Sequence, residues 1–130
     1  MKVQNGKEFN VGCFMVGPNW FGSYNGYVVT DAFQGEDEYS LPFTPHGGIT
    51  YYDESEKPLK GWHNAPVKLD MDDIKTKKGK IWTVIGFDTC HWGDDFTYEE
   101  AKEETLRFMD EVIEYIKRMP SSDVMHQEQE

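Results

Sequence analysis

The chain has 130 residues and a formal net charge of −11, from 13 lysines and arginines against 24 aspartates and glutamates. This acidic excess argues against nonspecific binding to a nucleic-acid backbone or to an anionic membrane surface. Aromatic residues make up 15% of the chain, so one compact core is feasible although only 38% of the residues are hydrophobic.

Strand-like segments dominate the first two thirds of the chain. Residues 11–16 form a short apolar run, and residues 27–33 follow an aromatic loop that ends in an Asn25-Gly26 turn signal. Further extended segments are predicted at residues 39–44, 47–54 and 80–88, of which the last is a continuous apolar run suited to the centre of a sheet. Residues 55–80 are predicted to form a long polar excursion from the sheet.

One helix is predicted, over residues 98–118. Thr97 and Glu100 fit a capping box, and Pro120 ends the helix. The apolar side chains that we expect to pack on the sheet repeat at three and four residues: Leu106, Met109, Ile113 and Ile116. The chain is therefore predicted to be one α+β domain over residues 1–119, with a mostly antiparallel sheet of four to six strands against this helix. Residues 120–130 are predicted to be a disordered tail.

The cysteines and the apolar segments predict a cytoplasmic protein with reduced thiols. Two cysteines, Cys13 and Cys90, are too few for a disulfide scaffold. No apolar stretch approaches the roughly 20 residues that span a membrane. The first ten residues lack the apolar segment of a signal peptide.

The segment TPHGGITYY, residues 44–52, is the first candidate site. Gly47 and Gly48 remove two side chains where the chain enters a strand, which exposes backbone N–H groups to a ligand. His46 beside them can donate to a phosphate or ligate a metal, and Thr50 belongs to the same candidate set. A turn with a surface histidine explains the pattern equally well.

The segment GFDTCHWGDD, residues 86–95, is the second candidate site. Asp88 and His91 are three residues apart at the exit of a strand, and Asp94 precedes a helix N-terminus with unpaired N–H groups. The alternative is that Asp94 only caps the helix and that His91 fills a turn. Together with His46, these three side chains could ligate Zn²⁺, Mn²⁺ or Fe²⁺, but no metal-binding motif supports this. We expect no organic cofactor and leave a metal ion open.

Aromatic and basic residues make up the third candidate site. Trp20 and Tyr24 lie in the loop NWFGSYNGY, and rings beside asparagine and glycine are typical of stacking recognition of a flat base. Trp62 and His63 could add a second wall, although at least half of these rings are expected to complete the core instead. Residues 57–80 hold seven lysines against three aspartates, which favours either a small anionic ligand or a solvated loop.

The segments NGYV, HGGITY and WTVIGFDTCHWGD, in this order, resemble a family of small proteins of tailed phages and bacteria. The resemblance covers about residues 25–95 and leaves out the C-terminal helix. It implies that the motif residues of this chain are His46, Gly47, Gly48, Asp88, His91 and Asp94. It also implies a phage accessory gene, for which we expect a role against host defence in the host cytoplasm, but it transfers no mechanism.

These features favour a binding protein over a catalyst. The leading hypothesis is an oligomeric anti-defence sponge that sequesters a cyclic or other nucleotide second messenger of bacterial immunity. Its ligand would be a small, anionic, nucleotide-like molecule, and we expect a homo-oligomer with no membrane partner. The alternative is a hydrolase, metal-dependent or with His/Asp acid–base catalysis, that acts on a phosphoester or a nucleotide.

Overall fold

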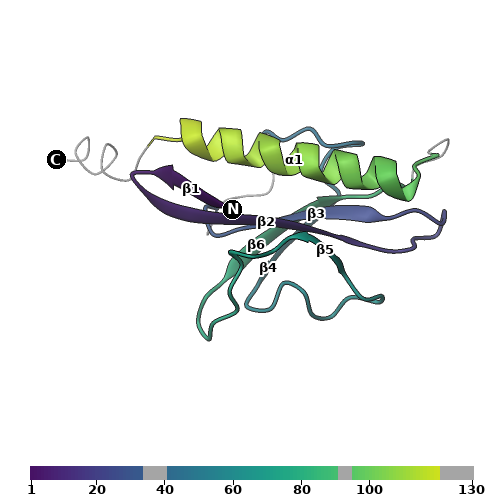
Figure 1. Cartoon of the computed structure of the whole chain (residues 1–130), viewed down its shortest axis with the longest axis horizontal. Helices are drawn as coiled ribbons and strands as arrows, with labels where there is room; N and C mark the ends of the chain where they lie inside the picture. The colour runs from purple at the N-terminus through teal and green to yellow at the C-terminus, as the bar shows by residue number, and fades with distance from the viewer. Residues whose placement is uncertain (34–40, 91–94, 121–130) are drawn as a thin grey trace.

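A six-stranded antiparallel sheet carries one helix along a single face in the computed structural model (Figure 1). The structure describes residues 1–33, 41–90 and 95–120. Its elements are β1 (Lys2–Asn5), β2 (Lys7–Val16), β3 (Asn25–Thr30), β4 (Tyr51–Ser55), β5 (Val67–Asp70), β6 (Trp82–Phe87) and α1 (Tyr98–Arg118). The predicted α+β fold, with four to six strands against one C-terminal helix, is confirmed.

The strands lie in the order β1-β2-β3-β6-β4, and β5 pairs with β2 outside this path. The long strand β2 pairs with β1 through its first residues and with β5 through Cys13, Phe14 and Met15. Strand β6 lies between β3 and β4, and all six of its residues are buried. Burial on both faces explains its continuous apolar sequence, as predicted for a central strand.

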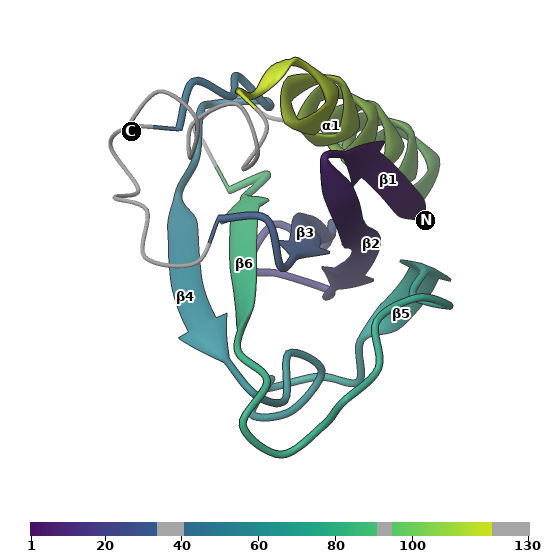
Figure 2. The ribbon, with the colours of Figure 1, turned by 90° about the vertical axis from the view of Figure 1, so that its left-hand side faces the viewer.

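Apolar side chains cover both faces of the sheet. On the α1 face, Val28, Ile85 and Phe87 pack with Phe108 and Val112 of the helix. On the other face, buried residues of the sheet form a second core: Phe14, Val16, Tyr27, Val29, Trp82 and Val84. Partly buried side chains pack against it, Tyr51 from β4 and Leu59, Trp62, Met71 and Ile74 from the excursion. Figure 2 shows the excursion and β5 on the side of the sheet away from α1. The predicted polar excursion therefore also covers apolar surface.

The helix begins and ends as predicted, but one expected core contact is wrong. Thr97 and Glu100 form the capping box, and α1 ends before Pro120. Met109, Ile113 and Ile116 are buried as expected, whereas Leu106 is 38% exposed. The buried stripe also includes Ala101 and Thr105. Helical spacing predicts which side of the helix is apolar, but it does not predict how wide the buried stripe is. Leu106 lies just outside the part of the helix surface that meets the sheet.

Gly26 explains how the first half of α1 approaches the sheet so closely. A Cβ atom at this position would overlap the Thr105 hydroxyl and the Phe87 ring. The buried Thr105 hydroxyl donates to the Ala101 carbonyl oxygen at 2.7 Å, so its polar group is satisfied within the helix. The close contact therefore needs both a glycine on β3 and a side chain that bonds to its own helix.

Several predicted strand limits are wrong. Strand β3 ends at Thr30, and residues 31–33 form a bend and turn. Strand β4 begins only at Tyr51, and residues 41–44 form no strand. Two short strands, β1 and β5, are not among the predicted elements. Strand β1 forms a tight hairpin with β2, from Asn5 opposite Lys7 to Lys2 opposite Asn10, whereas the pairing of β5 with β2 depends on contacts distant in sequence. Both cysteines are free. Over the described residues, no helix has the length and apolar character needed to cross a membrane.

Candidate functional site: an aromatic pocket at one end of the sheet

The strand pairing brings the described parts of the three predicted motifs to one end of the sheet. Near the end of β6, Phe87 pairs with Gly26 of β3, and Gly86 pairs with Tyr51 of β4. At the same end, Val16 of β2 pairs with Asn25 of β3. The loop before β3, the HGG segment before β4 and the segment after β6 therefore lie close together. Strands β4 and β6 are neighbours in the sheet.

The HGG segment is held against the helix. The His46 backbone N–H donates to the Glu104 carboxylate at 2.7 Å, and the His46 ring lies 4.4 Å from the Phe96 ring. Glu104 also accepts from the Arg107 Nε at 2.6 Å. The Arg107 hydrogen bond lowers the pKa of Glu104, against the opposing effect of desolvation. Glu104 therefore fixes the backbone of the segment as an ionised acceptor.

The diglycine forms the turn that leads into β4. Gly47 and Gly48 have φ values of 71° and 82°, a region that favours glycine. The Gly48 N–H donates to the Pro45 carbonyl oxygen at 2.8 Å, and the Thr50 N–H donates to the Gly86 carbonyl oxygen at 2.9 Å. These two N–H groups are thus engaged in the turn and in the sheet. A ligand-binding role for the diglycine and for Thr50 stays a prediction.

The second motif is described only in part. After β6, the Asp88 carboxylate accepts the Cys90 N–H at 3.1 Å and stabilises a local turn. His91 and Asp94 lie outside the described residues, so their predicted roles stay predictions. Among the described residues, no group of three or more His, Cys, Asp and Glu side chains is placed to hold a metal ion. The proposed ligand set of His46, Asp88, His91 and Asp94 is not tested, because it includes both of these positions.

A pocket of about 330 Å³ opens beside these motifs, and we call it the aromatic pocket. It is lined by Val16, Gly17, Pro18, Asn19, Trp20, Asn25, Tyr27, Trp62, His63 and Asn64. Trp62 and His63 line the same pocket as Trp20 of the aromatic loop, but their role as a second wall for a stacked base stays a prediction. Because Val16, Tyr27 and Trp62 belong to the second core, the pocket lies on the face of the sheet away from α1.

The inner wall of the pocket is rigidly packed. The Trp62 ring lies 4.5 Å from the Tyr27 ring, and its Nε1 donates to the Pro58 carbonyl oxygen at 2.8 Å. The Tyr27 ring also stacks on Phe14, with 5.2 Å between centroids. A Cβ atom at Gly86 would overlap the Tyr27 ring, which explains the glycine inside this central strand. Burial raises the pKa of Tyr27 to about 12, so its hydroxyl stays protonated at neutral pH.

Asn19 fixes the outer wall. Its Oδ1 accepts the N–H groups of Phe21 and Ser23, each at 3.0 Å. Its Nδ2 donates to Asn25 Oδ1 at 2.8 Å and to Thr89 Oγ1 at 2.7 Å. The loop is thereby bonded to itself, to β3 and to the segment after β6. It presents its tryptophan, Trp20, with 93% of the residue exposed.

The structure divides the predicted site residues between two faces. Trp20 lines the aromatic pocket, whereas the Tyr24 ring packs edge-on against Tyr98 of α1, with 4.9 Å between centroids. His46 also lies on the helix side, against Glu104. Asn19 and Asn25 of the predicted aromatic loop also line the pocket. The lining residues that belong to no predicted site are Val16, Gly17, Pro18 and Asn64, and the signal for Asn64 is its position next to Trp62 and His63.

Comparison with known protein families, with curated proteins and with solved structures finds no match to this chain. The resemblance of its motifs to small phage proteins therefore stays a prediction.

Proposed function

We propose that this protein binds a nucleotide second messenger, with a base stacked in the aromatic pocket, and releases it chemically unchanged. The observation that carries the proposal is the position of Trp20. This ring is 93% exposed at the rim of a pocket whose inner wall is made of packed rings. Each stacked base contributes about 1–3 kcal/mol in nucleic-acid complexes, and asparagine amides can bond to base edges.

The size of the pocket limits the ligand. A volume of about 330 Å³ is near the lower end of the usual range for small-molecule sites. The pocket therefore suits one base with its sugar rather than a whole dinucleotide. A messenger with two bases would need two such pockets, which supports the expected homo-oligomer.

The chemistry of the lining favours binding over hydrolysis at this pocket. Its described lining contains no carboxylate, and its two titratable side chains are those of His63 and Tyr27. Tyr27 has a pKa of about 12, which is too high for a general base near neutral pH. General acid–base catalysis works best with groups whose pKa lies near the working pH. A binding site with no paired acid and base is the simpler assignment.

In the proposed role, the protein is a sponge that lowers the concentration of an immune messenger in an infected bacterium. The motif resemblance to phage proteins supports this setting. A sponge must outcompete the messenger's own sensor, which calls for a dissociation constant near 10 nM, or about −11 kcal/mol. A preformed pocket favours such affinity because little ordering accompanies binding.

The test is calorimetric titration with nucleoside monophosphates, cyclic mono- and dinucleotides and ADP-ribose. Trp20→Ala should weaken binding by about 5- to 150-fold, which corresponds to the loss of one stacked base. Phe21→Ala is the matched control, because this ring is also exposed in the loop but does not line the pocket. Ligand recovered after heat denaturation should have its original mass. The proposal would be contradicted if Trp20→Ala and Phe21→Ala weakened binding equally or if none of the compounds bound. Recovery of a cleaved product would contradict it as well.

A further inference from the structure

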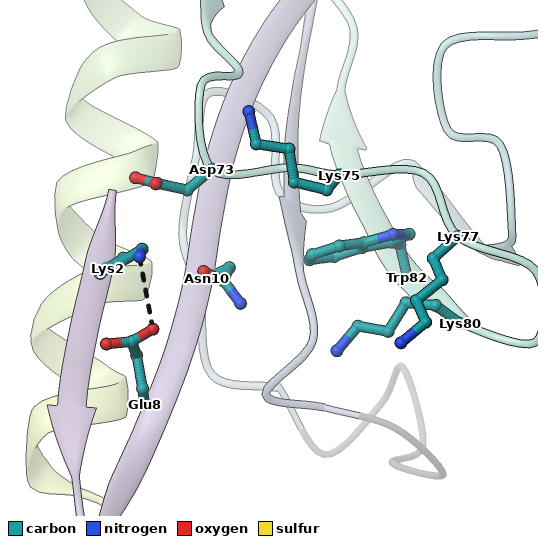
Figure 3. Close-up of a pocket in the computed structure, with 8 residues that line it drawn as sticks. All are labelled: Lys2, Glu8, Asn10, Asp73, Lys75, Lys77, Lys80 and Trp82. Atoms are coloured by element: carbon teal, nitrogen blue, oxygen red, sulfur yellow. Dashed lines mark ion pairs between the residues drawn. The ribbon is translucent and has the colours of Figure 1, made fainter.

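A second pocket lies at the other end of the sheet, where β1, β2 and β6 meet the last residues of the excursion (Figure 3). Its volume is about 330 Å³, and four of its lining residues are lysines: Lys2, Lys75, Lys77 and Lys80. We call it the lysine pocket. Along β2, Asn10 lines this pocket and Val16 lines the aromatic pocket, so the two are roughly 20 Å apart.

The two carboxylates that line the lysine pocket, Glu8 and Asp73, each have a cationic partner. The Glu8 carboxylate lies 3.7 Å from Lys2 Nζ, on the neighbouring strand. Asp73 lies 3.0 Å from the amino group of Met1, and their hydrogen bond lowers the pKa of Asp73. The ion pairs of the two acids in the lining are thus made with Lys2 and with the amino group of Met1, while Lys75 also contributes to the lowered pKa of Asp73.

Lys80 is held at the base of the pocket. Its Nζ lies 2.9 Å from Asp31 Oδ2 and 4.9 Å from the centre of the Trp82 ring. Asp31 is itself fixed, because it accepts from the backbone N–H and the side-chain Nδ2 of Asn10. The Trp82 ring is 2% exposed and forms a rigid apolar surface under the lysines. One cation is thus preorganised before any ligand arrives.

Lys75 and Lys77 differ from Lys80. Within residues 1–33, 41–90 and 95–120, neither has a carboxylate at ion-pair distance. Figure 3 shows Lys75 on one side of Trp82, with Lys77 and Lys80 on the other. The side chains of Lys75, Lys77 and Lys80 therefore line one hollow, with Asp73 near enough to Lys75 that this cation helps to lower the pKa of Asp73. An anion with several charges would relieve the mutual repulsion of the lysines.

We propose that the lysine pocket binds a compact polyanion of the phosphate class. Lys80 supplies the fixed charge, and Lys75 and Lys77 close on the ligand from the excursion. The ligand is either inorganic polyphosphate or the phosphate tail of a nucleotide, which share this chemistry. The site is independent of the proposed function, because a base in the aromatic pocket lies too far away to place its phosphates here.

The test is calorimetric titration of the native chain with inorganic triphosphate, ATP and adenosine at low ionic strength. The double variant Lys75→Ala/Lys77→Ala should bind triphosphate at least about tenfold more weakly, since it loses two of the three ligating charges. The control, Lys60→Ala/Lys78→Ala, removes the same net charge at exposed positions outside the pocket and should change affinity by less than about twofold. Urea unfolding of both variants should match that of the native chain, because all four side chains are exposed.

The affinities for triphosphate and ATP distinguish inorganic polyphosphate from a nucleotide as the ligand. Equal affinity for triphosphate and ATP supports inorganic polyphosphate as the ligand. Tighter binding of ATP than of triphosphate supports the phosphate tail of a nucleotide, provided that Lys75→Ala/Lys77→Ala also weakens ATP binding. No binding of triphosphate up to about 1 mM would overturn the proposal. Equal losses in the two double variants would overturn it as well, because they would show attraction by net charge alone.

Discussion

Asn19→Ala should destabilise the fold and release the loop that presents Trp20. The Asn19 carboxamide makes four hydrogen bonds, two through Oδ1 and two through Nδ2. Three of them are partly buried, including the 2.7 Å bond to the hydroxyl of Thr89, a residue that is itself buried. At about 0.5–1.5 kcal/mol net for each bond, the variant should lose about 2–4 kcal/mol of unfolding free energy.

Urea unfolding measures this loss directly, and two further variants make the comparison specific. Asn19→Asp keeps the acceptors for Phe21 and Ser23 but loses both donors, so it should lose at least about 1 kcal/mol. Asn64→Ala changes an exposed asparagine of the same pocket and should stay within about 0.5 kcal/mol of the native chain. If Asn19→Ala were as stable as Asn64→Ala, the loop would not be held by Asn19, and the preformed outer wall would be refuted.

Three other predictions follow from single contacts. Gly86→Ala should cost about 1–3 kcal/mol in thermal unfolding, because the added methyl group overlaps the Tyr27 ring; an unchanged midpoint would show that the ring moves freely. Burial raises the pKa of Cys13 to about 12, so iodoacetamide at pH 8 should modify the half-buried Cys90 first, and mass spectrometry showing Cys13 modified first would refute this. The pKa of Glu104 is lowered mainly by Arg107. The ionised Glu104 therefore contributes fully to stability above the ordinary glutamate pKa of about 4.3 in the unfolded chain, and this contribution is lost as the pH falls through the lowered pKa of the folded state. Glu104→Gln should therefore reduce the pH dependence of unfolding in this range, and an unchanged pH profile would contradict the assignment.

The elements predicted best are those with local signals. The capping box at Thr97 and the proline at position 120 gave the limits of α1, and the apolar run of β6 placed it at the centre of the sheet. The wrong assignment of Leu106 has a different origin. Periodicity gives the apolar side of a helix, but the edge of its buried stripe depends on the sheet surface that it meets.

Strands and site residues with distant partners were harder to predict. Strand β5 has only four residues, two of them apolar, and it pairs with β2 across more than fifty residues of chain. The lysines of residues 55–80 predict a polar excursion, whereas Leu59, Trp62 and Ile74 of this segment pack against the second core. In the aromatic loop, the sequence indicated stacking rings but could not separate the buried Tyr27 from the exposed Trp20. Tyr27 is buried because it lies in β3 on the face that packs into the second core, whereas Trp20 lies in the turn before β3.

The most direct test of the proposed base-stacking pocket is the NMR signal of the tryptophan indole N–H groups during titration with each nucleotide of the panel. The chain has four tryptophans, and two of them, Trp20 and Trp62, line the aromatic pocket. A bound base should shift these two signals strongly, because ring currents act over a few ångströms. With ligands that lack a polyphosphate, the signal of Trp82, at the opposite end of the sheet, should stay in place. The proposal would be contradicted if only the Trp82 signal shifted. It would also be contradicted if a nucleotide bound by calorimetry but left the signals of Trp20 and Trp62 unchanged.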